Sequence, residues 1–184
     1  IAYTRGYEAV PLFWMISGAV LTHRYLFTST RFRDFAIARI ARLYPLHLAT
    51  LLTVAILQIV SEARLGYQLI YGNNNLNYFF KNLLFASYWA PNSGFSFNAP
   101  IWSVSIEIPI YLIFGMVVAR SRSRSMPYFA FIGLAVLAST PLLRELAAQW
   151  IRGEFLRCLL YFATGSVVSQ VVARLRVRTG FRVL

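Results

Sequence analysis

Long apolar runs separated by basic connections set the pattern of this 184-residue chain. A helix needs about 20 mostly apolar residues to cross the roughly 30 Å hydrocarbon core of a bilayer. Runs of about this length recur along the chain, which predicts an all-α fold built as a polytopic transmembrane helical bundle. The five predicted spans are 9–26, 43–61, 100–119, 126–143 and 155–173.

A shorter apolar stretch, 78–89, is rich in aromatic side chains and also carries Lys81 and Asn82. It is too short for a span, and aromatic rings favour the headgroup level of a membrane. We therefore expect a short interfacial or re-entrant helix there. The whole chain, residues 1–184, is then expected to form part of one membrane domain.

The composition supports a membrane protein, because 58% of the residues are hydrophobic and the mean hydropathy is +0.58. The net charge of +12 would suggest nucleic acid as the partner of a soluble protein. The arginines, however, gather in the connections 24–42 and 120–125 and in the C-terminal tail, which is the positive-inside pattern. We expect no nucleic-acid partner, a cytoplasmic position for these three regions, and the opposite side for 62–99 and 144–154.

Cys158 is the single cysteine and lies in an apolar segment, so it gives no firm indication of redox compartment. We expect it to be a small helix-packing residue. The chain opens on Ile1 without a basic region followed by an apolar core and a cleavage site. This indicates an internal fragment that lacks its signal or first helix.

Glu107 is the strongest functional signal, because it lies near the middle of the predicted span 100–119. A carboxylate at the centre of a bilayer costs roughly 2.5–3.5 kcal/mol on insertion scales, and such residues usually face a bundle interior or a polar cavity. Ser103, Glu107 and Tyr111 are four residues apart, which places them on one helix face. This polar stripe is a candidate cavity lining.

Pro109 follows Glu107 in the same predicted helix and has no backbone N–H to donate to the Ser105 carbonyl. In lipid that carbonyl must be satisfied by a neighbour, a side chain or water, and we predict a kink of the helix beside Glu107. A structural alternative remains for the acid itself, in which Glu107 pairs with an arginine or a hydroxyl to fix helix packing.

Arg39 and Arg42 enter one end of the predicted span 43–61, and guanidinium groups bind phosphate oxygens in a bidentate manner. The pair is a candidate clamp for a nucleotide-bearing cosubstrate that arrives from the cytoplasm. Anchoring to anionic headgroups is the alternative. His47 shares a helix face with Arg39 and is a candidate cavity or substrate residue, as either a base or a hydrogen-bonded packing residue.

Ser17 and Gly18 place two small residues in the middle of the predicted span 9–26, where another helix or a ligand could approach closely. The chain has no metal-ligand spacing, no nucleophile elbow, no phosphate loop and no dinucleotide fingerprint. We therefore expect no metal.

Taken together and in this order, three stretches resemble the acyltransferase-3 family of integral membrane acyltransferases. AVPLFWMISG at 9–18 is similar to the family's G-V-x-L-F-F-x-x-S-G element, and RIARLYPLH at 39–47 is similar to its R-x-x-R-x-x-P element. IWSVSIEIPIY at 101–111 is similar to its W-S-L-x-x-E-x-x-x-Y element. The resemblance covers most of residues 6–115.

The resemblance implies transfer of an acyl group, often acetyl, from cytoplasmic acyl-coenzyme A to a hydroxyl of a sugar or cell-surface glycan. Family members modify lipopolysaccharide, capsule, peptidoglycan, nodulation factors and macrolides. It also implies a multi-pass protein of the inner (cytoplasmic) membrane of a bacterium, in contact with membrane lipid. By the same resemblance the coenzyme A phosphates bind Arg39 and Arg42, Glu107 is an accessory to catalysis, and the cavity is shaped by Ser17, Trp102 and Ser103.

The sequence departs from the family pattern in ways that limit these expectations. The family's expected catalytic histidine lies on a first helix that is absent here, and neither His23 nor His47 stands in the matching position. Ala19 replaces an aromatic residue of the family element. The fragment is thus expected to be inactive alone. The rival hypotheses are a proton-coupled transporter or flippase in which Glu107 carries protons, and a non-catalytic acyltransferase-like scaffold.

Overall fold

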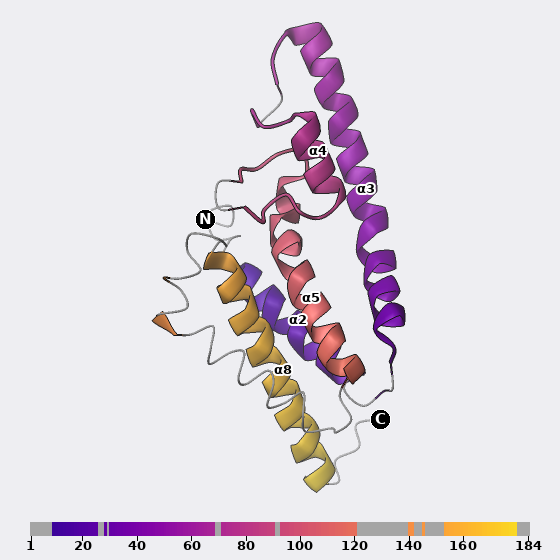
Figure 1. Ribbon diagram of the computed structural model, residues 1–184, viewed down its shortest axis with the longest axis vertical. Coiled ribbons are helices and arrows are strands. Elements are labelled where there is room, and N and C mark those ends of the chain that lie inside the picture. Colours follow the sequence, from indigo (N-terminus) through magenta and orange to yellow (C-terminus); the bar gives the residue numbers. More distant parts are fainter. Residues whose placement is uncertain are drawn as a thin grey trace.

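The computed structural model describes residues 9–25, 28, 30–68, 71–90, 93–120, 140–141, 145 and 153–179. Within these ranges every regular element is helical (Figure 1), which confirms the predicted all-α class. The elements are α2 (Ala9–Tyr25), α3 (Phe32–Leu65), α4 (Leu76–Leu83), the short 3-10 helix η2 (Ala99–Ile101), α5 (Trp102–Arg120) and α8 (Gly153–Thr179).

The α3 helix is much longer than the span predicted at 43–61, because it already begins at Phe32. At a rise of 1.5 Å per residue its 34 residues extend over roughly 50 Å, more than the hydrocarbon core of a bilayer. Its first half lies beside α5, and its second half continues past α5 alongside α4 (Figure 1). The arginines before residue 43 interrupt the apolar run, but the helical backbone continues through them. The hydrophobic pattern therefore predicted a start for this helix that is too late.

The α2 and α8 helices pack against each other more extensively than any other pair of described elements. A Cβ atom added at Gly18 would collide with the Phe162 carbonyl of α8, and one added at Gly165 would collide with the Met15 carbonyl of α2. The Ser166 hydroxyl also donates to the Gly18 carbonyl at 3.3 Å. Small residues therefore let these two helices meet backbone to backbone, as at many membrane helix crossings.

The short helix predicted at 78–89 corresponds to α4, an eight-residue helix that begins two residues earlier and already ends at Leu83. It begins after Asn75, whose side-chain oxygen accepts the Tyr78 backbone N–H at 3.1 Å. The described residues between α4 and η2, 84–90 and 93–98, form no further helix and contact both α3 and α5. Its position relative to a membrane interface stays a prediction.

Pro109 has no backbone N–H to donate to the Ser105 carbonyl, and a neighbouring side chain satisfies this carbonyl instead, as predicted. The indole N–H of Trp89 donates to this carbonyl at 2.8 Å. The backbone N–H of Tyr88 donates to the Ser105 hydroxyl at 3.2 Å. The connection before η2 is thus attached to α5 at the turn that the proline leaves incomplete.

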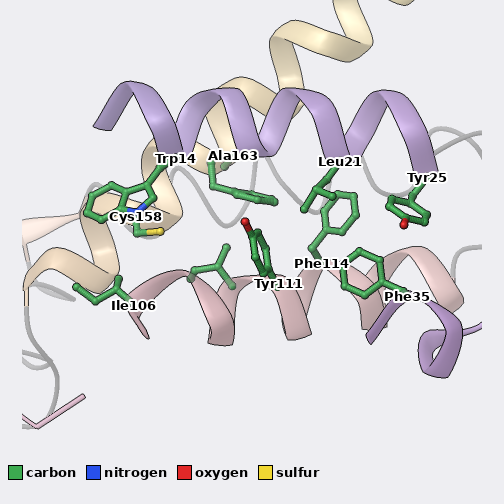
Figure 2. Close-up of a cluster of buried hydrophobic side chains, with 11 residues drawn as sticks. Trp14, Leu21, Tyr25, Phe35, Ile106, Tyr111, Phe114, Cys158 and Ala163 are labelled. Carbon is green, nitrogen blue, oxygen red and sulfur yellow. The ribbon is translucent and has the colours of Figure 1, made fainter. Parts of the chain in front are cut away.

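The buried core lies between α2, α5, α8 and the start of α3 (Figure 2). Cys158 of α8 is fully buried in it, which confirms a packing role for the cysteine. Phe35 of α3 enters above Gly115 of α5, where a Cβ atom would come within 2.6 Å of the ring. The eleven residues of the core are Trp14, Leu21, Tyr25, Phe35, Ile106, Ile110, Tyr111, Phe114, Cys158, Phe162 and Ala163.

Three described helices are long and apolar enough to cross a membrane: Phe32–Leu65, Ala99–Arg120 and Gly153–Leu175. They correspond to three of the predicted spans. The α2 helix, in place of the span predicted at 9–26, has 17 residues. The span predicted at 126–143 lies outside the described residues, apart from 140–141. The chain has the helices of a membrane protein, while the count of five spans and the orientation stay predictions.

Candidate functional site

Residues from the three sequence stretches 9–18, 39–47 and 101–111 together line one small cavity of about 100 Å³. Each of the helices α2, α3 and α5 contributes to its wall. Ser17 comes from α2, Arg39 and Arg42 from α3, and Tyr111 from α5. The other lining side chains are apolar: Phe13, Ile16, Val20, Leu21 and Leu43.

Glu107 lies behind this cavity and is fully buried, with no exposed surface. Its carboxylate interacts with the hydroxyls of Ser17 and Tyr111, and electrostatically with the guanidinium groups of Arg42 and Arg39. Neither carboxylate oxygen, however, has a partner in good hydrogen-bond geometry among the described residues. A buried charged group without such partners costs more than the roughly 1–3 kcal/mol of a neutral one, so this acid is expensive to keep.

Tyr111 connects the acid to the cavity. It is 6% exposed, and its hydroxyl points from α5 toward α2 (Figure 2). The sequence placed Ser103, Glu107 and Tyr111 on one face of the helix, and the last two do face Ser17 of α2 together. Glu107 and Tyr111 of α5 therefore face the Ser17 hydroxyl of α2.

Arg39 is held in position by aromatic groups. Its guanidinium lies 5.8 Å from the ring centroid of Tyr25 and 5.9 Å from that of Phe35. A terminal nitrogen also donates to the Tyr25 hydroxyl at 3.5 Å. Its buried Nε has no hydrogen-bond partner among the described residues. Tyr25 was not among the residues predicted for the site, because its only signal in the sequence is a polar aromatic residue at the end of the first apolar run.

Arg42 differs from Arg39 because it is exposed and makes no hydrogen bond within the described part of the chain. Its interaction there is the electrostatic one with Glu107. A side chain of this kind at the cavity wall is free to turn toward an anion. The two arginines together give the cavity a positive charge that the single buried acid does not cancel.

Ser17 and Gly18 have separate roles in the structure. Ser17 lines the cavity, whereas Gly18 is buried against α8 and provides the close approach to Phe162. Trp102 and Ser103 lie at the other end of the contact between α2 and α5. The Trp14 indole N–H donates to the Ser103 carbonyl at 3.4 Å, and the two tryptophan rings are edge to face at 6.1 Å. Trp102 and Ser103 thus hold α2 against α5 without appearing in the cavity wall.

His47 is not among the residues that line the cavity. Its Nε2 lies 2.8 Å from the Asn82 carbonyl oxygen, and because a carbonyl only accepts, Nε2 carries the proton. Nδ1 then accepts the side-chain N–H of Asn98 at 3.2 Å. The ring also packs on Phe85 with centroids 4.5 Å apart. Of the two possibilities that the sequence left open, the structure supports the hydrogen-bonded packing residue.

Asn82 and Asn98 are polar residues that the sequence analysis did not connect with His47. Asn98 also donates to the Thr50 hydroxyl at 2.8 Å, and Asn82 donates to Ser96 at 2.9 Å. The contacts of Asn98 attach the connection before η2 to the middle of α3, and that of Asn82 attaches the connection to α4. Polar residues within an otherwise apolar segment were the available signal, but their partners lie up to 51 residues away in the sequence.

The arrangement suits the binding of an anionic ligand beside a buried acid. Two guanidinium groups can pair with phosphate oxygens, and the Ser17 hydroxyl is a neutral donor in the same wall. The rest of the wall is apolar, and such surroundings strengthen contacts between charged groups. At about 100 Å³ the space admits one charged or polar group and not a whole nucleotide.

Comparisons with known proteins match this chain to acyltransferases. The family model described as "Acyltransferase domain" (Acyl_transf_3) matches residues 2–183. The chain is also 34% identical over 117 residues to "Acyltransferase MdmB" of Streptomyces mycarofaciens. That match covers 60% of this chain and 28% of the relative, so the chain spans well under half of the relative's length. No solved structure is detectably similar to this chain.

Proposed function

This chain belongs to the acyltransferase-3 family of membrane acyltransferases, and from this premise we propose that it is the donor-binding part of an O-acyltransferase. The proposed donor is acyl-coenzyme A, and the proposed acceptor is a hydroxyl of a sugar or cell-surface glycan. The chain matches only part of its relative, so this activity is proposed for the full-length protein. The protein is proposed to lie in the inner membrane of a bacterium.

The observation that carries this proposal is the meeting of Arg39, Arg42, Ser17 and Tyr111 around one cavity. The order of the helices along the chain does not by itself bring these residues together, because they come from three helices and from positions up to 94 residues apart. A transporter that moves protons through Glu107 has no need of two arginines in the same cavity. An enzyme that accepts a phosphate-bearing donor does need them.

The proposed reaction is acyl transfer from a thioester to an alcohol. The acceptor oxygen attacks the thioester carbonyl, a C–O bond forms, and the C–S bond breaks. Coenzyme A leaves as the thiol and takes up the proton that the hydroxyl loses, so no oxidant or reductant is required. The resemblance places the general base outside this chain.

Within this reaction each residue of the site has a proposed role. Arg39, oriented by the Tyr25 and Phe35 rings, and the more exposed Arg42 bind phosphate groups of the donor. The hydroxyls of Ser17 and Tyr111 lie beside Glu107, and the carboxylate of Glu107 attracts both arginines electrostatically. In this scheme Glu107 orders the donor site and is an accessory to catalysis.

The test is donor affinity in the full-length protein, measured with purified protein in lipid nanodiscs and acetyl-coenzyme A. Arg39→Ala and Arg42→Ala are each expected to weaken binding by about 10-fold, since hydrogen bonds to charged groups are worth about 1.5–3 kcal/mol. Arg33→Ala is the matched control, because Arg33 is exposed on the same helix and does not line the cavity. Unchanged affinity in both cavity variants would exclude the proposed phosphate contact.

A further inference from the structure

A cavity of about 620 Å³ lies between the second half of α3, the start of α4 and the connection before η2. The part of α3 that lines it is the part that runs alongside α4, past the end of α5 (Figure 1). Its wall begins on α3 at Leu52, roughly 15 Å beyond Arg42 along the helix axis at a rise of 1.5 Å per residue. The sequence pattern assigns nothing to this space, which is separate from the arginine-lined cavity.

A chain of hydrogen bonds orients the polar side of the wall. The backbone N–H of Phe97 donates to Asn74 Oδ1 at 2.7 Å, and the Asn74 amide donates to Gln58 Oε1 at 3.0 Å. The Gln58 amide in turn donates to Glu62 Oε1 at 2.9 Å. Gln58 and Asn74 are only 3% and 7% exposed. Because a backbone N–H can only donate and a carboxylate only accepts, both amides are fixed in one orientation.

The other polar groups of this wall are available to a ligand. Glu62 Oε2, the Asn75 side-chain N–H and the Gln68 amide make no hydrogen bond to any described residue. All three side chains are exposed, whereas the network that orients Glu62 is buried. The wall therefore combines one oriented carboxylate with amide groups that can both donate and accept.

Aromatic side chains form another part of the same wall. The rings of Phe79 and Phe97 lie edge to face with centroids 5.7 Å apart. Phe97 has a φ of 31°, a left-handed backbone angle that is rare for a bulky residue and is held here by the bond to Asn74. Strained residues of this kind are concentrated at ligand sites.

We propose that this cavity binds the acceptor as a neutral, hydroxyl-rich ring, which is the chemistry of a sugar. This proposal rests on the proposed function, which requires an acceptor hydroxyl. Sugar hydroxyls donate to a carboxylate and exchange hydrogen bonds with amides, while the C–H faces of the ring pack on apolar and aromatic side chains. The volume is within the roughly 300–1,000 Å³ of small-molecule sites, which combine apolar walls with a few oriented polar groups.

The charge of the wall disfavours other occupants. None of the described residues that line the cavity is basic, and Glu62 is acidic, so a phosphate-bearing headgroup or nucleotide would be repelled. The hydrocarbon chain of a lipid would cover Glu62 and the amides without forming hydrogen bonds to them, which costs free energy. The arginine-lined cavity has the opposite charge, as expected if one cavity binds the donor and the other the acceptor.

The separation of the two cavities is compatible with one reaction. In acyl-coenzyme A the pantetheine arm separates the thioester from the phosphates. A donor whose phosphates contact Arg39 and Arg42 thus has its acyl group well away from the arginines. An acceptor that bound directly beside the arginines would not meet that acyl group.

The experiment measures dissociation constants of methyl glucoside, methyl galactoside and methyl mannoside for the full-length protein in nanodiscs, by ligand-observed NMR. At least one of them is expected to bind. Ala55→Phe fills the cavity and should weaken this binding at least about 10-fold. Ala49→Phe is the matched control, because Ala49 is exposed on the same helix and outside the cavity, and it should keep the native affinity.

A second variant tests the role of the carboxylate without filling the space. Glu62→Gln should weaken binding of the neutral glycoside by about fivefold, because hydrogen bonds to charged groups are stronger than those to neutral ones. The native protein should also prefer this glycoside to the anionic methyl glycoside of the corresponding uronic acid, and Glu62→Gln should reduce the preference. Glu154→Gln removes a carboxylate outside the cavity and should change neither value.

Absence of glycoside binding by the native protein would overturn the proposal, as would equal affinities for Ala55→Phe and Ala49→Phe. An unchanged preference in Glu62→Gln would also contradict it. Acetyl-coenzyme A affinity, measured on the same samples, should stay within about twofold of the native value in all four variants, because none of them lies at the arginine-lined cavity. Glycoside binding without any binding of acetyl-coenzyme A would show that the proposed function has failed while the cavity still binds sugars.

Discussion

His47 and Glu107 are both buried polar residues in membrane-type helices, but their surroundings differ. His47 is 2% exposed, and each of its ring nitrogens has a hydrogen-bond partner: Asn82 of α4 for one and Asn98, just before η2, for the other. Glu107 has no exposed surface, and neither of its oxygens has a partner in good hydrogen-bond geometry among the described residues. His47 thus has two well-formed hydrogen bonds, whereas Glu107 has only looser contacts with the Ser17 and Tyr111 hydroxyls and its electrostatic interaction with two arginines.

The difference separates a structural role from a functional one. Paired groups such as His47 lower the free energy of the fold and attach one segment to another. A costly acid beside two arginines and a cavity does little for stability, and functional sites commonly carry such costs. The comparison therefore supports a structural role for the middle of α3 around His47, and it is consistent with the proposed donor site around Glu107.

The largest expected effect is that of Glu107→Gln in the full-length protein. The amide has nearly the same shape but no charge, so it removes the field that holds Arg42 and Arg39. Acyl transfer is expected to fall by at least about 100-fold, the lower range for a group that assists proton transfer or orders a site. The thermal midpoint should stay the same or rise, because a neutral amide is easier to bury.

Activity and thermal unfolding of Glu107→Gln are measured on the same membrane preparation. Near-native transfer would return Glu107 to a structural role. A large loss of stability would equally break the comparison, because it would show that the charge contributes to the fold.

His47→Ala is expected to act on stability. It removes two hydrogen bonds and the ring contact with Phe85, which should lower the free energy of unfolding by roughly 2–4 kcal/mol. Thermal unfolding in nanodiscs is the measurement, and Thr53→Ala is a control on the exposed side of the same helix. If transfer were lost with no change in the thermal midpoint, His47 would belong with Glu107 and the distinction would fail.

A smaller effect is expected for Trp89→Phe, which removes the indole donor of the Ser105 carbonyl. The cost should be about 1–2 kcal/mol of stability, since that carbonyl has no helical donor opposite Pro109. Pro109→Ala supplies a backbone N–H to the same carbonyl, so Trp89→Phe should cost less in that background. Equal costs in both backgrounds would show that the Ser105 carbonyl does not determine the effect of Trp89.

Much of this arrangement could be predicted from the helical pattern. Spacing by four placed Glu107 and Tyr111 on one face, and the missing N–H of Pro109 predicted a partner for the Ser105 carbonyl. Short-range geometry is sufficient in such cases because a helix fixes the relation between nearby residues.

Contacts between distant segments were not predictable in the same way. Nothing in the spacing indicated that Tyr25 would hold Arg39 or that Asn98 would reach His47. These pairs depend on how whole helices and connections pack, which the local pattern does not determine. The predicted start of α3 was also too late, because charged residues end an apolar run without ending a helix.

The most direct test of the account is whether Arg39 and Arg42 recognise phosphate. Dissociation constants for acetyl-coenzyme A and for acetyl-pantetheine, which lacks the phosphates, are measured with native full-length protein and with the Arg39→Ala/Arg42→Ala double variant. Recognition of phosphate by the two arginines predicts a loss of at least about 10-fold for acetyl-coenzyme A and less than about twofold for acetyl-pantetheine. An equal loss for both donors, or no loss for either, would contradict it.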